Sequence, residues 1–302
     1  MAEWLALAAL LALLARGAFW LGQELRGWGY PPRADWELPL PPPILVAHRG
    51  GKGLYPENTL EAFQACVERH DCRFLGLDVR CTRDGVPVVF HDATVERTTG
   101  GTGAVHEMTL AALQQLDAGR SHAVDPRGVG AHVPIRVPTL EAVFRALPQC
   151  WFNLDIKPGQ PPCEAEVAAV IRRCGMSRRA IAGSSVHGRA LRFRALAPEL
   201  PTFFSRRSVL AFLLFRRLGL LGWYRPLHHV LRVPETYRGL RVVTPGVVAA
   251  AHRVGVPVFV CTVNDVARMR RLLGMGVDGI ITGHPDRFAE ALSQSADRPR
   301  DE

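Results

Sequence analysis

The sequence contains no CxxC pair, and its 7 cysteines are scattered and odd in number. Their positions therefore signal neither a cysteine-based zinc site nor a disulfide framework. We expect mostly buried free thiols at Cys66, Cys72, Cys81, Cys150, Cys163, Cys174 and Cys261. The chain also lacks a glycine-rich dinucleotide-binding turn, which argues against a nucleotide-binding doubly wound sheet.

Negative charge is in short supply. The chain of 302 residues has 37 Lys+Arg against 28 Asp+Glu, a net charge of +9, and is 48% hydrophobic. This composition is typical of a globular protein, and the basic balance suits nucleic acid, an anionic membrane or an anionic substrate. Because most arginines bracket apolar segments and form no stripe, we expect no nucleic-acid partner. Nothing in the sequence indicates an obligate protein partner.

A basic region is also missing from the N-terminus, where residues 1–25 form an apolar segment of about membrane-spanning length. This favours an uncleaved transmembrane or signal-anchor helix over its alternative, a cleaved signal peptide. The arginines that follow the segment predict a single-pass membrane protein with the bulk of the chain in the cytosol. We interpret residues 26–43 as a proline-rich linker and residues 291–302 as a polar tail.

Residues 203–226 form a second unusual segment, in which an apolar run is flanked by pairs of arginines and followed by Trp223 and Tyr224. Such a helix could lie in a membrane interface and contact membrane lipid. It could equally be an ordinary barrel helix with a buried face. The sequence does not decide between these two interpretations.

Apolar, strand-like runs alternate with helix-like stretches over residues 44–290. The expected strands are Ile44–Ala47, Phe74–Val79, Pro87–Phe90, Trp151–Ile156, Ala180–Gly183, Thr202–Phe204, Val256–Val260 and Gly279–Thr282. Eight strands alternating largely with helices predict an α/β protein, a (β/α)₈ TIM barrel that follows the N-terminal anchor. Catalytic groups are then expected at the carboxyl ends of the strands.

Reactive side chains occur at these strand ends. His48 and His91 each follow an apolar run, as do Asp78, Asp155 and the nearby Lys157. Two imidazoles, two carboxylates and a lysine are suited to metal-assisted acid–base chemistry on a phosphate. We interpret the other histidines as surface or packing residues.

Several phrases give the chain a close resemblance to the glycerophosphodiester phosphodiesterase family. They are HRGG…YPENTLEAF (48–63), LDVRCTRDGVPVVFHD (77–92), RTTGGTG (97–103), VPTLEAV (137–143), FNLDIK (152–157), VCTVND (260–265) and GVDGIITGHP (276–285). They occur in the family's order over roughly residues 44–290, nearly the whole of the chain after the linker.

The resemblance implies a TIM-barrel phosphoric diester hydrolase that uses a divalent cation, Ca²⁺ or Mg²⁺. By position, His48 and His91 would be its general acid and base. Arg49 and Lys157 would bind the phosphate oxygens.

The resemblance further implies a metal bound by Asp78 and Asp155, with Glu57 near the metal or orienting a catalytic group. One departure affects this site, because Gly76 stands where the family has a second metal-binding carboxylate. Loss of a ligand weakens a hard-cation site. An alternative is therefore a catalytically impaired protein of the same fold that binds lipid or acts as a scaffold.

The implied substrates are glycerophosphodiesters or lysophospholipids. The apolar N-terminus and residues 203–226 favour a lysophospholipase D-like activity, with water-soluble glycerophosphodiesters as the alternative. The sphingomyelinase D-type phospholipases share the barrel but lack the HRG and PENT phrases seen here.

Overall fold

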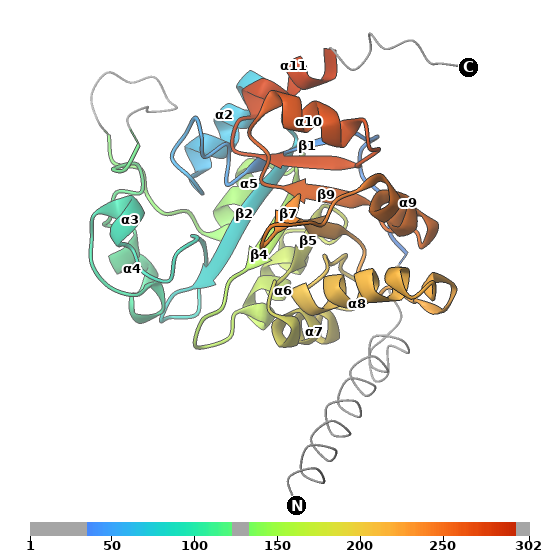
Figure 1. Ribbon diagram of the computed structural model, residues 1–302. Coiled ribbons are helices and arrows are strands. Elements are labelled where there is room, and N and C mark those ends of the chain that lie inside the picture. The colour runs from blue at the N-terminus through green and yellow to red at the C-terminus, as the bar shows by residue number, and fades with distance from the viewer. Residues whose placement is uncertain (1–34, 123–132, 294–302) are drawn as a thin grey trace, which may run out of the picture.

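The computed structural model of the protein describes residues 35–122 and 133–293 (Figure 1). Its main sheet has the strand order β5-β4-β2-β1-β10-β9-β6, in which all neighbours are parallel. These strands are β1 (Ile44–His48), β2 (Phe74–Cys81), β4 (Trp151–Ile156), β5 (Ala180–Gly183), β6 (Leu231–Val233), β9 (Val258–Cys261) and β10 (Gly279–Thr282). A short strand, β3 (Pro87–Val89), pairs antiparallel with β2.

Residues 201–204 join the two edges of this sheet. The Ala182 N–H in β5 donates to the Pro201 carbonyl at 3.0 Å, and the Phe204 N–H donates to the Val230 carbonyl at 3.0 Å, just before β6. Phe203 and Val230 also form a parallel bridge. The expected strand at 202–204 is thus reduced to a connecting segment, and the sheet is TIM-barrel-like.

Helices follow most strands and pack on the outside of the sheet (Figure 1). They are α2 (Leu60–His70), α3 (Glu96–Thr99), α4 (Leu110–Leu113), α5 (Leu140–Ala146), α6 (Glu164–Arg173), α7 (His187–Leu196), α8 (Arg206–Arg217), α9 (Pro245–Arg253), α10 (Val266–Leu273) and α11 (Phe288–Ser293). Side-chain caps fix several starts; for example, Thr59 Oγ1 accepts a hydrogen bond from the Ala62 N–H at 3.2 Å. Short 3₁₀ turns occupy Val105–Glu107, Leu221–Trp223 and Pro285–Arg287.

The polar side chains of the candidate site lie on the inward face of the barrel, at the carboxyl ends of the strands. Successive residues of a strand point to opposite faces, so alternate positions of each strand face the interior. Phe74 and Phe259 fill the interior edge-to-face, with ring centroids 5.9 Å apart. Counting by two along the chain from Phe74 gives Gly76 and Asp78, which lie above this apolar layer at the carboxyl end of β2.

The segment 203–226 is a barrel helix followed by a 3₁₀ turn. Helix α8 buries Ala211, Phe212 and Phe215 against the core, and Tyr224 packs on both phenylalanines. The 3₁₀ turn that follows the helix presents Trp223, which is 75% exposed. The buried face agrees with the barrel-helix interpretation of this segment.

The localisation expected from the sequence requires correction. No helix among the described residues is long and apolar enough to cross a bilayer, which requires about 20 apolar residues. Helix α8, with 12 residues, is the longest of them. The expected single-pass anchor at residues 1–25 lies outside the described residues. A membrane location with a cytosolic catalytic domain is therefore not assigned.

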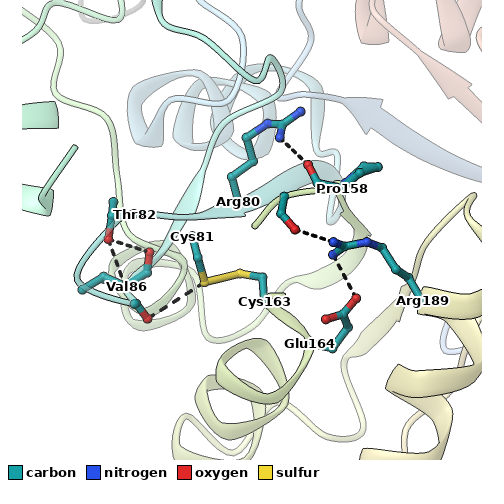
Figure 2. Close-up of a disulfide and its surroundings, with 10 residues drawn as sticks. Arg80, Cys81, Thr82, Val86, Pro158, Cys163, Glu164 and Arg189 are labelled. Carbon is teal, nitrogen blue, oxygen red and sulfur yellow. Dashed lines mark hydrogen bonds and ion pairs between the residues drawn. A yellow bond between two sulfur atoms is a disulfide. The ribbon is translucent and has the colours of Figure 1, made fainter. Parts of the chain in front are cut away.

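A disulfide joins Cys81 and Cys163, two of the cysteines expected to be free, whereas the other five are free thiols (Figure 2). It joins the last residue of β2 to the residue that precedes α6, across a sequence separation of 82. Cys66, Cys72 and Cys150 are buried free thiols, as expected. The bond therefore ties the loop after β4 to the end of β2, beside Asp78.

We predict that removing this bond destabilises the protein by about 2–4 kcal/mol, because the unfolded chain regains the freedom of a long loop. Urea unfolding of the wild type and of a Cys81→Ala/Cys163→Ala variant should differ by this amount. Reductant should lower the wild-type midpoint to that of the variant and leave the variant unchanged. An identical wild-type midpoint with and without reductant would contradict the prediction.

Candidate active site

His48, the last residue of β1, lies at the mouth of the barrel. Its Nδ1 is 3.2 Å from the hydroxyl of Thr262, which follows β9. Loss of solvation lowers the pKa of His48 to about 3, with the charges of Arg49, Lys52 and Arg232 acting in the same direction and the charge of Asp78 opposing them. The ring is therefore neutral at neutral pH and available to accept a proton.

His91 follows β3, and the backbone fixes its approach to the same mouth. The N–H of the preceding residue, Phe90, donates to the Asp78 carbonyl at 2.9 Å. The Nδ1 of His91 lies 2.5 Å from Asp92 Oδ1. Burial raises the pKa of Asp92, but hydrogen bonds from Arg97 and His91 outweigh this and lower it to about 2. A carboxylate held at Nδ1 orients the ring and leaves Nε2 for proton transfer.

Glu57 lies between two arginines. Its Oε1 accepts from Arg97 at 2.6 Å and from Arg49 at 2.9 Å, and its Oε2 accepts from Arg97 at 3.0 Å. Burial raises the pKa of Glu57, but the hydrogen bond from Arg97 and the charges of both arginines lower it to about 2. Glu57 thus holds Arg49 and Arg97 in place through charged hydrogen bonds.

Asp78 and Asp155 lie side by side on β2 and β4. Lys157 bridges them, with its Nζ 2.9 Å from an oxygen of each. Arg49 Nε lies 3.1 Å from Asp78, and Arg232 Nη2 donates to Asp155 at 3.0 Å. Burial raises the pKa of Asp155, but the charges of Arg232 and Lys157 outweigh this and lower it.

These contacts form one chain, in which ion pairs of alternating sign run from Asp92 to Arg232 and His91 joins through its contact with Asp92. It runs through His91, Asp92, Arg97, Glu57, Arg49, Asp78, Lys157, Asp155 and Arg232. The structure therefore brings all the site residues expected from the sequence into one network, except His48, whose pKa responds to the charges of Asp78, Arg49 and Arg232. Such a network holds each side chain in place before a substrate binds.

The expected ligands for Ca²⁺ or Mg²⁺ do not form a metal cluster. No group of three or more His, Cys, Asp or Glu side chains within residues 35–122 and 133–293 is arranged to hold an ion. Glu57 is paired with arginines, while Asp78 and Asp155 are each paired with two cations. A hard cation binds through carboxylate oxygens, and here Arg and Lys side chains already engage those oxygens, so this arrangement of the donor set does not fit one.

Several members of the network had no role assigned from the sequence. Arg97 and Asp92 stand in phrases that carry the resemblance, as does Asn58, whose side chain exchanges hydrogen bonds with Asp78 at 3.1 and 3.3 Å. Thr262 likewise follows a predicted strand. Arg232 lies on β6, a strand of three residues that carries an arginine at its centre and follows two histidines. The sequence around Arg232 therefore gave little indication that this residue belongs to the site.

A cavity of about 370 Å³ adjoins Lys157. Its wall includes the Cys81–Cys163 disulfide and two guanidinium groups, Arg80 and Arg189. Arg80 donates to the Pro158 carbonyl at 2.7 Å, and Arg189 pairs with Glu164 at 3.0 Å (Figure 2). This cavity offers space for a polar group beside the ion-pair network.

Comparison with known proteins identifies the family to which the chain belongs. The profile of the glycerophosphoryl diester phosphodiesterase family matches residues 48–287. A putative glycerophosphodiester phosphodiesterase of Bacillus subtilis is 33% identical over 245 residues, which cover 80% of this chain and 95% of the relative. A lysophospholipase D of Rattus norvegicus is 24% identical over 273 residues, which cover 82% and 85% of the two chains.

A solved structure of a relative contains a product. A phosphodiesterase from Oleispira antarctica, in complex with the product sn-glycerol-3-phosphate, superposes with a TM-score of 0.66 and 25% identity. The match covers 83% of this chain and 97% of the other. The resemblance and the enzyme class expected from the sequence, a phosphoric diester hydrolase, are thus confirmed. The protein belongs to the glycerophosphoryl diester phosphodiesterase family, whose members generally depend on a divalent cation.

Proposed function

We propose that this protein hydrolyses glycerophosphodiesters to a phosphomonoester and a free alcohol, with residues 44–290 as its catalytic domain. The observation that carries the proposal is the neutral, half-buried His48 in the same barrel mouth as His91 and the cations Arg49 and Lys157. A diester anion repels nucleophiles, so fixed positive groups must offset the charge that grows on its phosphoryl oxygens.

In this proposal the two imidazoles divide the proton transfers. His48 accepts the proton of the attacking hydroxyl, since burial keeps its ring neutral. His91, oriented by Asp92, donates a proton to the leaving alkoxide. Arg49 and Lys157 bind the phosphate oxygens. The attacking group is water or a neighbouring hydroxyl of the substrate, and these residues serve either route.

The dependence on Ca²⁺ or Mg²⁺ stays a prediction from the resemblance. By the resemblance Asp78 and Asp155 would hold the ion, with Glu57 at their edge, whereas in this structure all three carboxylates are paired with cations. The proposed proton transfers involve none of these three side chains.

A lysophospholipid is the second candidate substrate. The hairpin of β7 (Thr236–Tyr237) and β8 (Leu240–Arg241) follows the carboxyl end of β6, and its Tyr237 and Leu240 are 52% and 75% exposed. Apolar side chains at the rim of the mouth favour a substrate with an acyl chain. The similarity to a lysophospholipase D agrees with this candidate.

The alternative of a catalytically impaired lipid-binding or scaffold protein is not favoured. Loss of function would remove the need to hold Arg49, Glu57 and His91 in a single network, yet all three remain in it. Gly76 affects the metal ligands alone.

We predict that His48→Ala and His91→Ala each lower kcat for glycerophosphocholine by roughly 100-fold or more, because each removes a proton-transfer group. Choline release by the purified variants measures this loss. The matched control is His252→Ala, since His252 lies on α9 and pairs with Asp278. Circular dichroism checks that each variant is folded, and full activity in either site variant would disprove the assignment.

The low pKa of His48 predicts its behaviour with pH. Its ring signals in NMR should remain those of the neutral form from about pH 8 to about pH 5, because its pKa is lowered to about 3. The unfolded chain binds this proton near pH 6.5, so the free energy of unfolding should fall as pH falls from about 6.5 towards about 3. A titration midpoint near the ordinary histidine value would contradict the loss of solvation to which the low pKa is attributed.

A Tyr237→Ser/Leu240→Ser variant separates the two substrates. We predict that it raises KM for lysophosphatidylcholine roughly tenfold, from the loss of apolar contact, and leaves glycerophosphocholine turnover unchanged. Choline release measures both reactions. Trp223→Ser, which alters an exposed aromatic outside the hairpin, serves as the control. Equal effects on both substrates, or none, would remove the hairpin from substrate binding.

A further inference from the structure

The fold does not require a glycine at position 76, at the mouth of the barrel. A Cβ at this position would lie 3.4 Å from the Ala47 carbonyl oxygen and from Val46 Cγ1, which is ordinary contact. Gly76 pairs with His48 on β1 and with Asn153 on β4, within regular strands. Neither the backbone conformation nor the space for a Cβ atom therefore explains the missing carboxylate.

A guanidinium from the far side of the barrel reaches this region. Arg232 on β6 donates to Asp155 on β4 at 3.0 Å, although these strands are not neighbours in the sheet. Its guanidinium carbon lies 3.7 Å from the ring centroid of Phe203, which supports it as a cation–π partner. Its charge also lowers the pKa of His48, so the two groups belong to one site.

The balance of charge around the two aspartates is that of an anion site. Lys157 contacts both carboxylates, and Arg49 and Arg232 each contact one. Over these five side chains the three cations outnumber the two carboxylates, which leaves a net charge of +1. A divalent cation placed here would meet carboxylates that are already paired and would be repelled by that net charge. A phosphate diester carries the opposite charge and would meet the same three groups favourably.

We propose that Arg232, together with Lys157 and Arg49, binds the phosphate and supplies the positive charge that a divalent cation would otherwise supply. The protein then turns over its substrate without an added divalent cation. This inference rests on the proposed function and deepens it by naming the phosphate-binding groups. Arg232 is thereby a substrate-contacting residue that the resemblance did not supply.

Turnover of glycerophosphocholine by the wild type is measured in EDTA and then with Ca²⁺ or Mg²⁺. The expected rates agree within about twofold, since the fixed cations are always present. Activity that disappears in EDTA and returns with a cation would overturn the inference while leaving the proposed function intact. No turnover under any of these conditions would refute the proposed function instead.

Binding of sn-glycerol 3-phosphate in EDTA, by calorimetry, tests the site independently of turnover. Wild-type protein should bind, and Arg232→Gln should bind roughly tenfold or more weakly, as expected for a lost charge-assisted hydrogen bond. Arg232→Lys, which keeps the charge, should recover part of the affinity and guards against a folding defect. Arg268→Gln is the matched control, because Arg268 pairs with Glu235 just after β6.

Two binding results would overturn the inference. One is binding in EDTA that is equal in the wild type and in Arg232→Gln. The other is wild-type binding that occurs only when Ca²⁺ or Mg²⁺ is added. Affinity lost in Arg232→Gln but kept in Arg268→Gln would support it, whether or not this diester is turned over.

Discussion

Two carboxylates placed side by side at the ends of neighbouring parallel strands set the main constraint on this molecule. Asp78 and Asp155 are register partners in a buried barrel mouth, where like charges repel strongly unless they are compensated. The fold compensates them with Lys157 between them and with Arg49 and Arg232 on either side. Removing one partner would leave a buried charge exposed to that repulsion.

This compensation connects the structure to chemistry. The cations are held by carboxylates and so remain oriented when no substrate is present, which is the preorganisation that phosphate chemistry requires. The cations keep their charge, whereas loss of solvation lowers the pKa of His48 and keeps its ring uncharged at neutral pH. The site therefore combines fixed positive charge with a neutral base, and His91 completes it beside Asp92. Family membership and these contacts agree on phosphodiester hydrolysis.

Much of the barrel could be predicted from the sequence, because buried parallel strands give apolar runs bounded by turns. The histidines and aspartates could be placed because the carboxyl ends of such strands meet at one face. Arg232 could not, since its strand is three residues long and its contact with Asp155 depends on closure of the sheet. The Cys81–Cys163 bond was likewise missed because a separation of 82 residues carries no pairing signal.

The central claim is that this chain cleaves a glycerophosphodiester at the bond to its alcohol. Phosphorus NMR of glycerophosphocholine incubated with the purified, full-length protein tests it most directly. The account predicts that the diester signal is replaced by that of sn-glycerol 3-phosphate as free choline accumulates. A persistent diester signal with folded protein, or the appearance of phosphocholine and glycerol, would contradict it.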